Sequence, residues 1–177
     1  MVTRHRLLKL VATLIVLLGF VFGPAGVAPA SAASVYTITA SHTGFALDVE
    51  GAATGDGARI VQWPLNVLYV PANELWAFSA VPGAPDTYAI QSVRSGRVLT
   101  VFSSAPGAAV VQWHNKHLST QQWYEVKQGG TARKYRNVAT GLYLDVSGAS
   151  YNAGAPLVQW YQTNGANQVF NVSYWPY

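Results

Sequence analysis

The tripeptide Val-Gln-Trp occurs three times in this chain of 177 residues, ending at Trp63, Trp113 and Trp160. The gaps between these tryptophans are 50 residues (113 − 63) and 47 residues (160 − 113). A motif repeated at a nearly constant period indicates a fold assembled from copies of one supersecondary unit. Each tryptophan is then either a packing element of its unit or part of a small site that the unit presents.

Three copies of a longer unit surround these motifs, beginning at Tyr36, Tyr88 and Tyr135. Each copy has an opening strand-like segment, a Ser/Thr-Gly turn or a close variant, and a short strand around LDV or LTV. A Gly-rich loop, the Val-Gln-Trp strand, a polar loop and a closing aromatic strand follow. Short alternating runs between turn residues predict an all-β protein. A propeller needs four or more such units, so a closed threefold barrel fits three copies best. The expected repeats are 34–80, 81–128 and 129–177.

The first 33 residues have the pattern of a secretory signal peptide. Three basic residues precede an uncharged apolar run at 10–23, and small residues with Ala-Ser-Ala at 30–32 follow. A membrane-spanning helix needs about 20 apolar residues, and this run is shorter. We therefore expect residues 1–33 to be cleaved and residues 34–177 to be exported, with an uncleaved anchor as the alternative.

Charge and cysteine content exclude several classes of function for the expected mature domain. The chain has 11 basic and 7 acidic residues, and three of the basic ones lie in the leader, so 8 − 7 leaves a net charge of +1. The sequence has no basic run that would indicate nucleic acid as a partner. Cysteine is absent, which excludes disulfides and thiolate metal sites. A length of 144 residues (177 − 33) suits one domain.

Taken in order, LDV, Gly-rich loop, VQW, polar loop and Asn-Gln-x-aromatic are similar to the pattern of the ricin-type β-trefoil lectins, including the xylan-binding modules of bacterial glycosidases. The resemblance covers essentially all of 34–177 and occurs three times in register. It implies a β-trefoil of twelve strands, with a six-stranded barrel closed by three hairpins. It also implies a carbohydrate as the partner, no catalysis and no cofactor. We expect no membrane partner after cleavage of the leader, and a monomer.

Strand alternation places one acidic residue at the surface in two of the repeats. Successive side chains of a strand face opposite ways, so Leu47 and Val49 share a face and Asp48 points away from the core. The same arrangement holds for Asp145 in its Leu-Asp-Val segment. A carboxylate held in this way can accept hydrogen bonds from two neighbouring sugar hydroxyls. A nearby aromatic ring can stack on the apolar face of the sugar.

The resemblance assigns sites to the first and third repeats. In the third repeat it assigns the sugar-binding carboxylate to Asp145 and the stacking ring to Trp160, fifteen residues later (160 − 145). Asn167 and Gln168 match the amides of the family, and the closing aromatic is Phe170 where the family usually has Trp.

In the first repeat the corresponding residues are Asp48, Trp63 (63 − 48 = 15) and Asn73. Glu74 stands where the family usually has Gln, and the loop between Trp63 and Asn73 is three residues longer than its third-repeat counterpart. This loop could reshape or occlude the site. We therefore rank the third repeat first.

The second repeat lacks most of the pattern. Thr100 replaces the aspartate, Thr120 replaces the asparagine, and only Trp113 and Gln121 remain. We interpret this repeat as a structural remnant. Because Trp113 persists without an aspartate, the three tryptophans could serve packing as well as stacking. The glutamines of the triple motif are expected to be structural hydrogen-bonders, and Trp76, Trp123 and Phe170 are expected in the core.

Catalysis and protein binding are the two classes of function that compete with sugar binding. Glycosidases place two carboxyl groups about 5–10 Å apart across one bond, and Asp48 with Glu74 is the only same-site pair. The i, i+3 pair His114 and His117 has no acidic or cysteine partner nearby in sequence, so neither metal binding nor catalysis is expected. The alternative outside sugar binding is a protein-binding scaffold or protease inhibitor that uses the loop around Tyr69.

Overall fold

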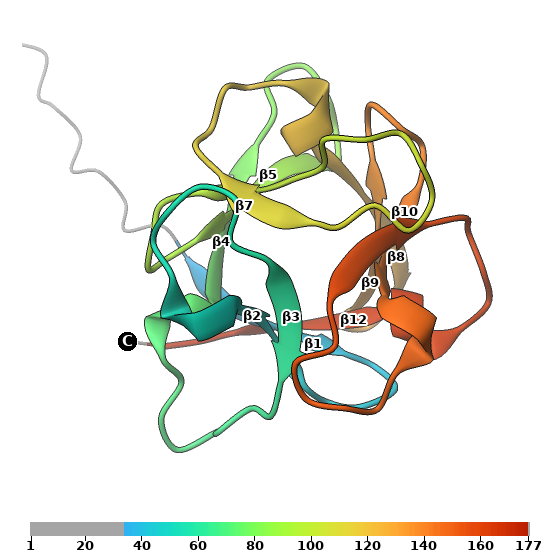
Figure 1. The fold of residues 1–177 in the computed structure, drawn as a ribbon. Helices are drawn as coiled ribbons and strands as arrows, with labels where there is room; N and C mark the ends of the chain where they lie inside the picture. Colours follow the sequence, from blue (N-terminus) through green and yellow to red (C-terminus); the bar gives the residue numbers. More distant parts are fainter. Residues whose placement is uncertain (1–33, 177) are drawn as a thin grey trace, which may run out of the picture. The chain divides into compact units, whose positions relative to one another are not determined.

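The computed structural model describes residues 34–176, which form twelve β-strands and five three-residue 3-10 turns. The predicted signal peptide lies outside the described residues. The all-β prediction is confirmed, and the three repeats surround a common axis (Figure 1). In the described part of the chain, no helix has the length and apolar character needed to cross a bilayer.

Six strands pair antiparallel in a closed ring, and three hairpins cap one end of it (Figure 1). The ring runs β1 (Val35–Ala40), β4 (Leu75–Ala80), β5 (Thr87–Ser92), β8 (Trp123–Gly129), β9 (Ala132–Asn137) and β12 (Phe170–Tyr174), which pairs back to β1. The hairpins are β2 (Ala46–Val49) with β3 (Ile60–Trp63), β6 (Val98–Thr100) with β7 (Val111–Trp113), and β10 (Tyr143–Val146) with β11 (Leu157–Trp160). This is the predicted β-trefoil.

The 3-10 turns follow the sequence differences between repeats. Every repeat has one turn before its closing strand: η2 (Ala72–Glu74), η3 (Ser119–Gln121) and η5 (Ala166–Gln168). A second turn follows the aspartate-bearing strand only in the first and third repeats, as η1 (Glu50–Ala52) and η4 (Ser147–Ala149). At the centre of these two turns the glycines have φ of 62°, a conformation that residues with a side chain rarely adopt. The shorter loop of the second repeat has no such turn.

The closing aromatic residues form the centre of the core, as predicted. Trp76, Trp123 and Phe170 are fully buried and belong to one apolar cluster with the inward aliphatic residues of the hairpins. The indole N–H of Trp76 donates to the Leu47 carbonyl oxygen (3.0 Å), and that of Trp123 donates to the Leu99 carbonyl oxygen (3.1 Å). These bonds satisfy the one polar group that each ring buries.

The glutamines of the triple motif join the repeats in a cycle. The buried Gln62 side chain donates to the carbonyl oxygens of Ser150 (2.8 Å) and Asn152 (2.9 Å) in the third repeat, and it accepts a bond from Thr43 Oγ1 (3.0 Å) in its own repeat. The other two glutamines repeat this geometry: Gln112 donates to Ala53 and Gly55 of the first repeat, and Gln159 donates to Ser103 and Ala105 of the second. The predicted structural role of the three glutamines is therefore confirmed: their hydrogen bonds hold neighbouring repeats together.

Candidate functional site

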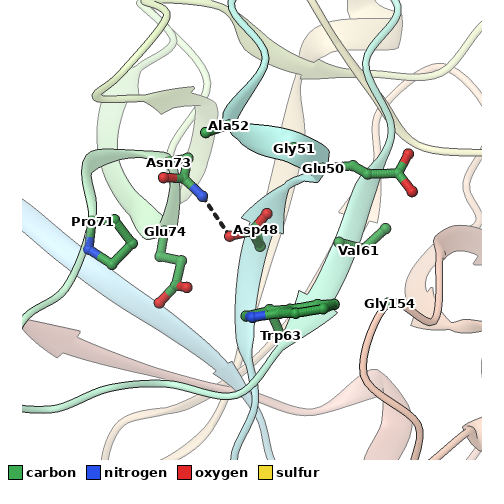
Figure 2. Close-up of a pocket in the computed structure, with 10 residues that line it drawn as sticks. All are labelled: Asp48, Glu50, Gly51, Ala52, Val61, Trp63, Pro71, Asn73, Glu74 and Gly154. Atoms are coloured by element: carbon green, nitrogen blue, oxygen red, sulfur yellow. Dashed lines mark hydrogen bonds between the residues drawn. The ribbon is translucent and has the colours of Figure 1, made fainter.

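Two clefts occur at equivalent places in the first and third repeats. Cleft one has a volume of about 350 Å³ and contains Asp48, Trp63 and Asn73 (Figure 2). Cleft three has a volume of about 400 Å³, with Asp145 and Trp160 on its walls. The structure thus brings together the sequence-predicted residues of each site, except that Gln168 lies behind the wall of cleft three. The remaining lining residues are Glu50, Gly51, Ala52, Val61, Pro71, Glu74 and Gly154 in cleft one, and Gly107, Ser147, Gly148, Ala149, Val158, Thr163 and Asn167 in cleft three.

In cleft three, the carboxylate of Asp145 is held from behind by Gln168. Strand β10 buries the flanking aliphatic residues and turns Asp145 toward the cleft. The Gln168 Nε2 donates to Asp145 Oδ2 (2.8 Å) and to the Tyr161 carbonyl oxygen (2.7 Å), and its Oε1 accepts from the Thr163 N–H (2.8 Å). Gln168 is fully buried and does not line the cleft, and its contact in this site is with Asp145. Burial raises the pKa of Asp145, and the bond from Gln168 opposes this rise.

The tryptophan walls are half-exposed and pack on a glycine from another repeat. Trp63 is 49 % exposed and Trp160 is 42 % exposed, which leaves ring surface available to a ligand. A Cβ added at Gly154 would lie 3.7 Å from Trp63, and one added at Gly107 would lie 3.3 Å from Trp160. The rings therefore pack on one side and face solvent on the other, so stacking and packing are compatible. Sequence reasoning missed these glycines because they lie far away along the chain.

In cleft one the polar contacts are arranged differently. Asn73 Nδ2 donates directly to Asp48 Oδ2 (2.6 Å; Figure 2), whereas Asn167 Nδ2 donates to the Val146 carbonyl oxygen (3.3 Å). Burial raises the pKa of Asp48 to about 6, although the bond from Asn73 opposes this rise. Burial, and then repulsion by Asp48, raise the pKa of Glu74 to about 7. Two carboxyl groups with raised pKa values thus share this cleft.

The second repeat has different chemistry at the corresponding place. Thr100 Oγ1 donates to the Val98 carbonyl oxygen (3.0 Å) and accepts from Gln121 Nε2 (3.2 Å). The Phe102 ring lies edge-on against Trp113, with 4.8 Å between the ring centroids. Phe102 therefore packs against part of the Trp113 ring. These contacts support the interpretation of this repeat as a structural remnant.

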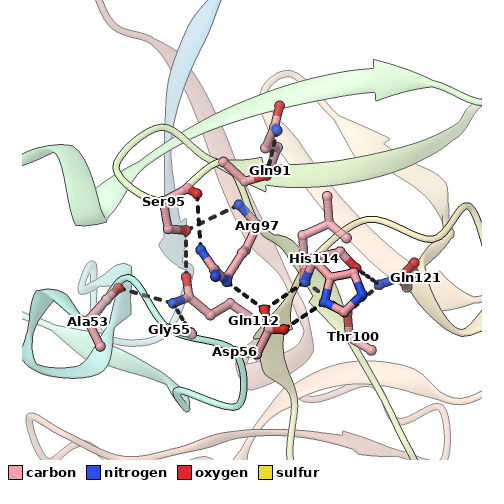
Figure 3. A network of polar contacts seen from close by, with 12 residues as sticks. Ala53, Gly55, Asp56, Gln91, Ser95, Arg97, Thr100, Gln112, His114 and Gln121 are labelled. Atoms are coloured by element: carbon pink, nitrogen blue, oxygen red, sulfur yellow. Dashed lines mark hydrogen bonds and ion pairs between the residues drawn. The ribbon is translucent and has the colours of Figure 1, made fainter.

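The expectation that His114 has no acidic partner is wrong. The His114 Nδ1 lies 2.6 Å from Asp56 Oδ2, and the His114 N–H donates to Asp56 Oδ1 (2.9 Å; Figure 3). Arg97 Nε also donates to Asp56 Oδ1 (2.5 Å), so the group ties the first-repeat loop to the second repeat. Asp56 was missed because 58 residues separate it from His114. Among the described residues, no three His, Asp or Glu side chains form a cluster that could hold a metal ion.

The long loop of the first repeat leaves cleft one open. Leu68 and Tyr69 are 93 % and 73 % exposed, and neither lines the cleft. Val70 instead is buried in a small cluster with Val35 and Leu75, against which Trp175 also packs. Of the two outcomes left open by the sequence, the loop therefore does not occlude the site but contributes Pro71 to its wall.

The family model for a ricin-type beta-trefoil lectin domain-like protein matches three overlapping segments, at residues 22–113, 72–160 and 119–175. The chain belongs to this lectin family. No curated protein matches it.

Solved structures similar to this lectin include ThreeFoil, a designed threefold-symmetric protein, at 33 % identity and a TM-score of 0.72, covering 78 % of this chain and 96 % of ThreeFoil. An exo-beta-1,3-galactanase from Clostridium thermocellum is 26 % identical with a TM-score of 0.74; the match covers 80 % of this chain but only 30 % of the galactanase. The ricin B-like lectin of Macrolepiota procera, solved with lactose, is 22 % identical with a TM-score of 0.66, covering 81 % of this chain and 96 % of that lectin, and shows the fold alone.

Proposed function

We propose that this ricin-type β-trefoil lectin is exported after removal of residues 1–33 and binds galactose- or xylose-type sugars without catalysis. Cleft three is the principal site and cleft one the secondary site. The observation that carries the proposal is the recurrence of a buried carboxylate beside a half-exposed tryptophan in both clefts. The structure of the Macrolepiota procera lectin with lactose supports the choice of ligand.

The geometry of each cleft suits a single sugar ring. The carboxylate of Asp145 accepts from two adjacent hydroxyls, while Trp160 covers the apolar side of the ring. Such open sites bind weakly one at a time. Two sites on one domain raise the avidity for a polysaccharide that reaches both.

The carboxyl groups do not fit glycoside hydrolysis. Asp48 and Asp145 lie in separate clefts. Asp48 and Glu74 are immediate neighbours, since each affects the pKa of the other directly. A glycosidase instead needs its two carboxyl groups on opposite sides of the scissile bond.

The test is a glycan and polysaccharide binding screen on residues 34–177, with Asp145→Ala, Asp48→Ala and Thr100→Ala in parallel. We expect Asp145→Ala to lose most binding, Asp48→Ala to lose a smaller part, and Thr100→Ala, the matched change in the second repeat, to keep the wild-type signal. A folded wild-type protein that binds no sugar would refute the proposal.

A second candidate function is suggested by the exposed apolar loop. Three consecutive apolar residues, Val67, Leu68 and Tyr69, are exposed to solvent. A protein-binding scaffold or a protease inhibitor presents a surface of this type. A scaffold should retain its partner after loss of Asp48 and Asp145, and should lose it after Leu68→Ser and Tyr69→Ser. The same panel of variants thus separates the two functions.

A further inference from the structure

Cleft one and cleft three share a frame but differ in charge. In both, an Asp, a Trp, an Asn, a Val and a Gly-Ala turn occupy corresponding places. Two positions change from neutral to acidic: Glu50 stands in the place of Ser147, and Glu74 in the place of Gln168. Arg59 neutralises Glu50 through bonds of 2.8 Å and 2.6 Å. The uncompensated acidic group is therefore Glu74.

The Glu74 carboxyl group is buried in the wall of the cleft, and its Oε2 lacks a partner. Only 3 % of Glu74 is exposed, and its Oε2 makes no hydrogen bond. The Gln168 side chain, by contrast, uses its polar atoms in three bonds. Figure 2 shows Glu74 beside Asp48 and Trp63, with its carboxyl oxygens directed away from Asn73. A buried, unpartnered acceptor is unfavourable unless a ligand or a proton satisfies it.

Asn73 positions Asp48 in cleft one. Gln168 holds Asp145 in cleft three, but in cleft one Asn73 has taken over this role through its 2.6 Å bond to Asp48 Oδ2. The Glu74 carboxyl group also bonds to that of Asp48, which leaves Glu74 Oε2 as the atom without a partner. What Glu74 adds to the cleft is a second carboxylate that faces the place of the sugar.

We propose that cleft one selects a sugar that carries a free primary amine, such as a 2-amino-2-deoxyhexose unit, whereas cleft three takes neutral sugars. This inference rests on the proposed function, because it assigns a ligand class to one of the same two sites. An ammonium group donates three hydrogen bonds and accepts none. It satisfies Glu74 Oε2 and neutralises the carboxyl pair, while a neighbouring hydroxyl donates to the free oxygen of Asp48. Charge-assisted bonds of this type are about twice as strong as neutral ones.

The experiment titrates residues 34–177 with galactosamine, N-acetylgalactosamine and galactose at pH 7 and follows the indole N–H signals of Trp63 and Trp160 by NMR. Galactosamine is expected to bind cleft one about tenfold or more tightly than the other two sugars, since one charge-assisted bond is worth about that factor. Glu74→Gln should remove this preference but retain binding of galactose. The reciprocal variant Gln168→Glu should introduce the preference at Trp160.

The outcomes separate this inference from the proposed function. Neutral sugars that bind at Trp160, without any amine preference at Trp63, overturn the inference and leave the lectin function standing. An amine preference that persists in Glu74→Gln also overturns it, because the selectivity then comes from Asp48 alone. If no sugar perturbs either tryptophan, both proposals fail. Circular dichroism of each variant confirms that the fold is intact.

Discussion

The Glu74→Gln variant should be more stable than the wild type, and the gain should depend on pH. The pKa of Glu74 rises from 4.5 to about 7 on folding. The difference between these two pKa values corresponds to about 3.4 kcal/mol of differential interaction between the protonated and ionised forms. Because part of the rise comes from the coupling with Asp48, which titrates together with Glu74, we expect a pH-dependent difference of about 2 kcal/mol.

The sign follows from the proton balance. The folded state holds the Glu74 proton up to about pH 7, whereas the unfolded chain releases it near its ordinary pKa. Between these values the folded state binds more protons, so the stability of the wild type falls as the pH rises. The variant carries no group that titrates at this position. The difference between the two proteins should therefore be smallest at pH 4.5 and should reach its full value above pH 7.

Urea unfolding followed by tryptophan fluorescence, at half-unit steps from pH 4.5 to pH 8, measures this difference. The m-value should be the same in both proteins, since the exposed surface is unchanged. The matched control Gln168→Glu places a carboxyl group in cleft three and should lose stability as the pH rises. A gain from Glu74→Gln that is constant over the whole range would refute the reasoning, because it would come from new hydrogen bonds and not from proton release.

Two further predictions concern contacts between repeats. In Gly107→Ala the new Cβ would lie 3.3 Å from the Trp160 ring at a φ of 84°, so we expect about 1 kcal/mol of destabilisation and weaker galactose binding at Trp160 but unchanged binding at Trp63, both measured by NMR titration. In Gln159→Ala the buried amide loses its bonds to two carbonyl oxygens of the second repeat, which should lower the free energy of unfolding by about 2–3 kcal/mol. Urea titration checks this value, and a loss below about 0.5 kcal/mol would show that water replaces the amide.

The fold could be predicted because its signals are local and repeated three times. Alternation along each hairpin strand correctly turned Asp48 and Asp145 away from the core, since the period of a strand is fixed. The closing aromatic residues were likewise recognisable as core because each ends a repeat. The three copies of the motif indicated a closed barrel, whereas a single Val-Gln-Trp strand would have fitted many β folds.

The details of the clefts could not be predicted because they depend on contacts between distant residues. The glycines beneath Trp63 and Trp160 come from other repeats, and no pattern along the chain pairs them. In cleft one Asn73 bonds the aspartate, whereas in cleft three Gln168 does so. This difference depends on side-chain rotamers. The sequence shows that Glu74 differs from Gln168, but only the structure shows that Asn73 holds Asp48 and that Glu74 Oε2 is buried without a partner.

The geometry also explains why the Val-Gln-Trp motif persists in a repeat whose aspartate is lost. Gln112 joins the second repeat to the first through two carbonyl oxygens, and Trp113 packs near Gly57 of that repeat. Neither contact involves the position of Thr100, so the contacts that join the repeats do not depend on the residue at the carboxylate position. A change at the carboxylate position therefore leaves the barrel closed. The residue at the carboxylate position can consequently vary from repeat to repeat, as Asp48, Thr100 and Asp145 do.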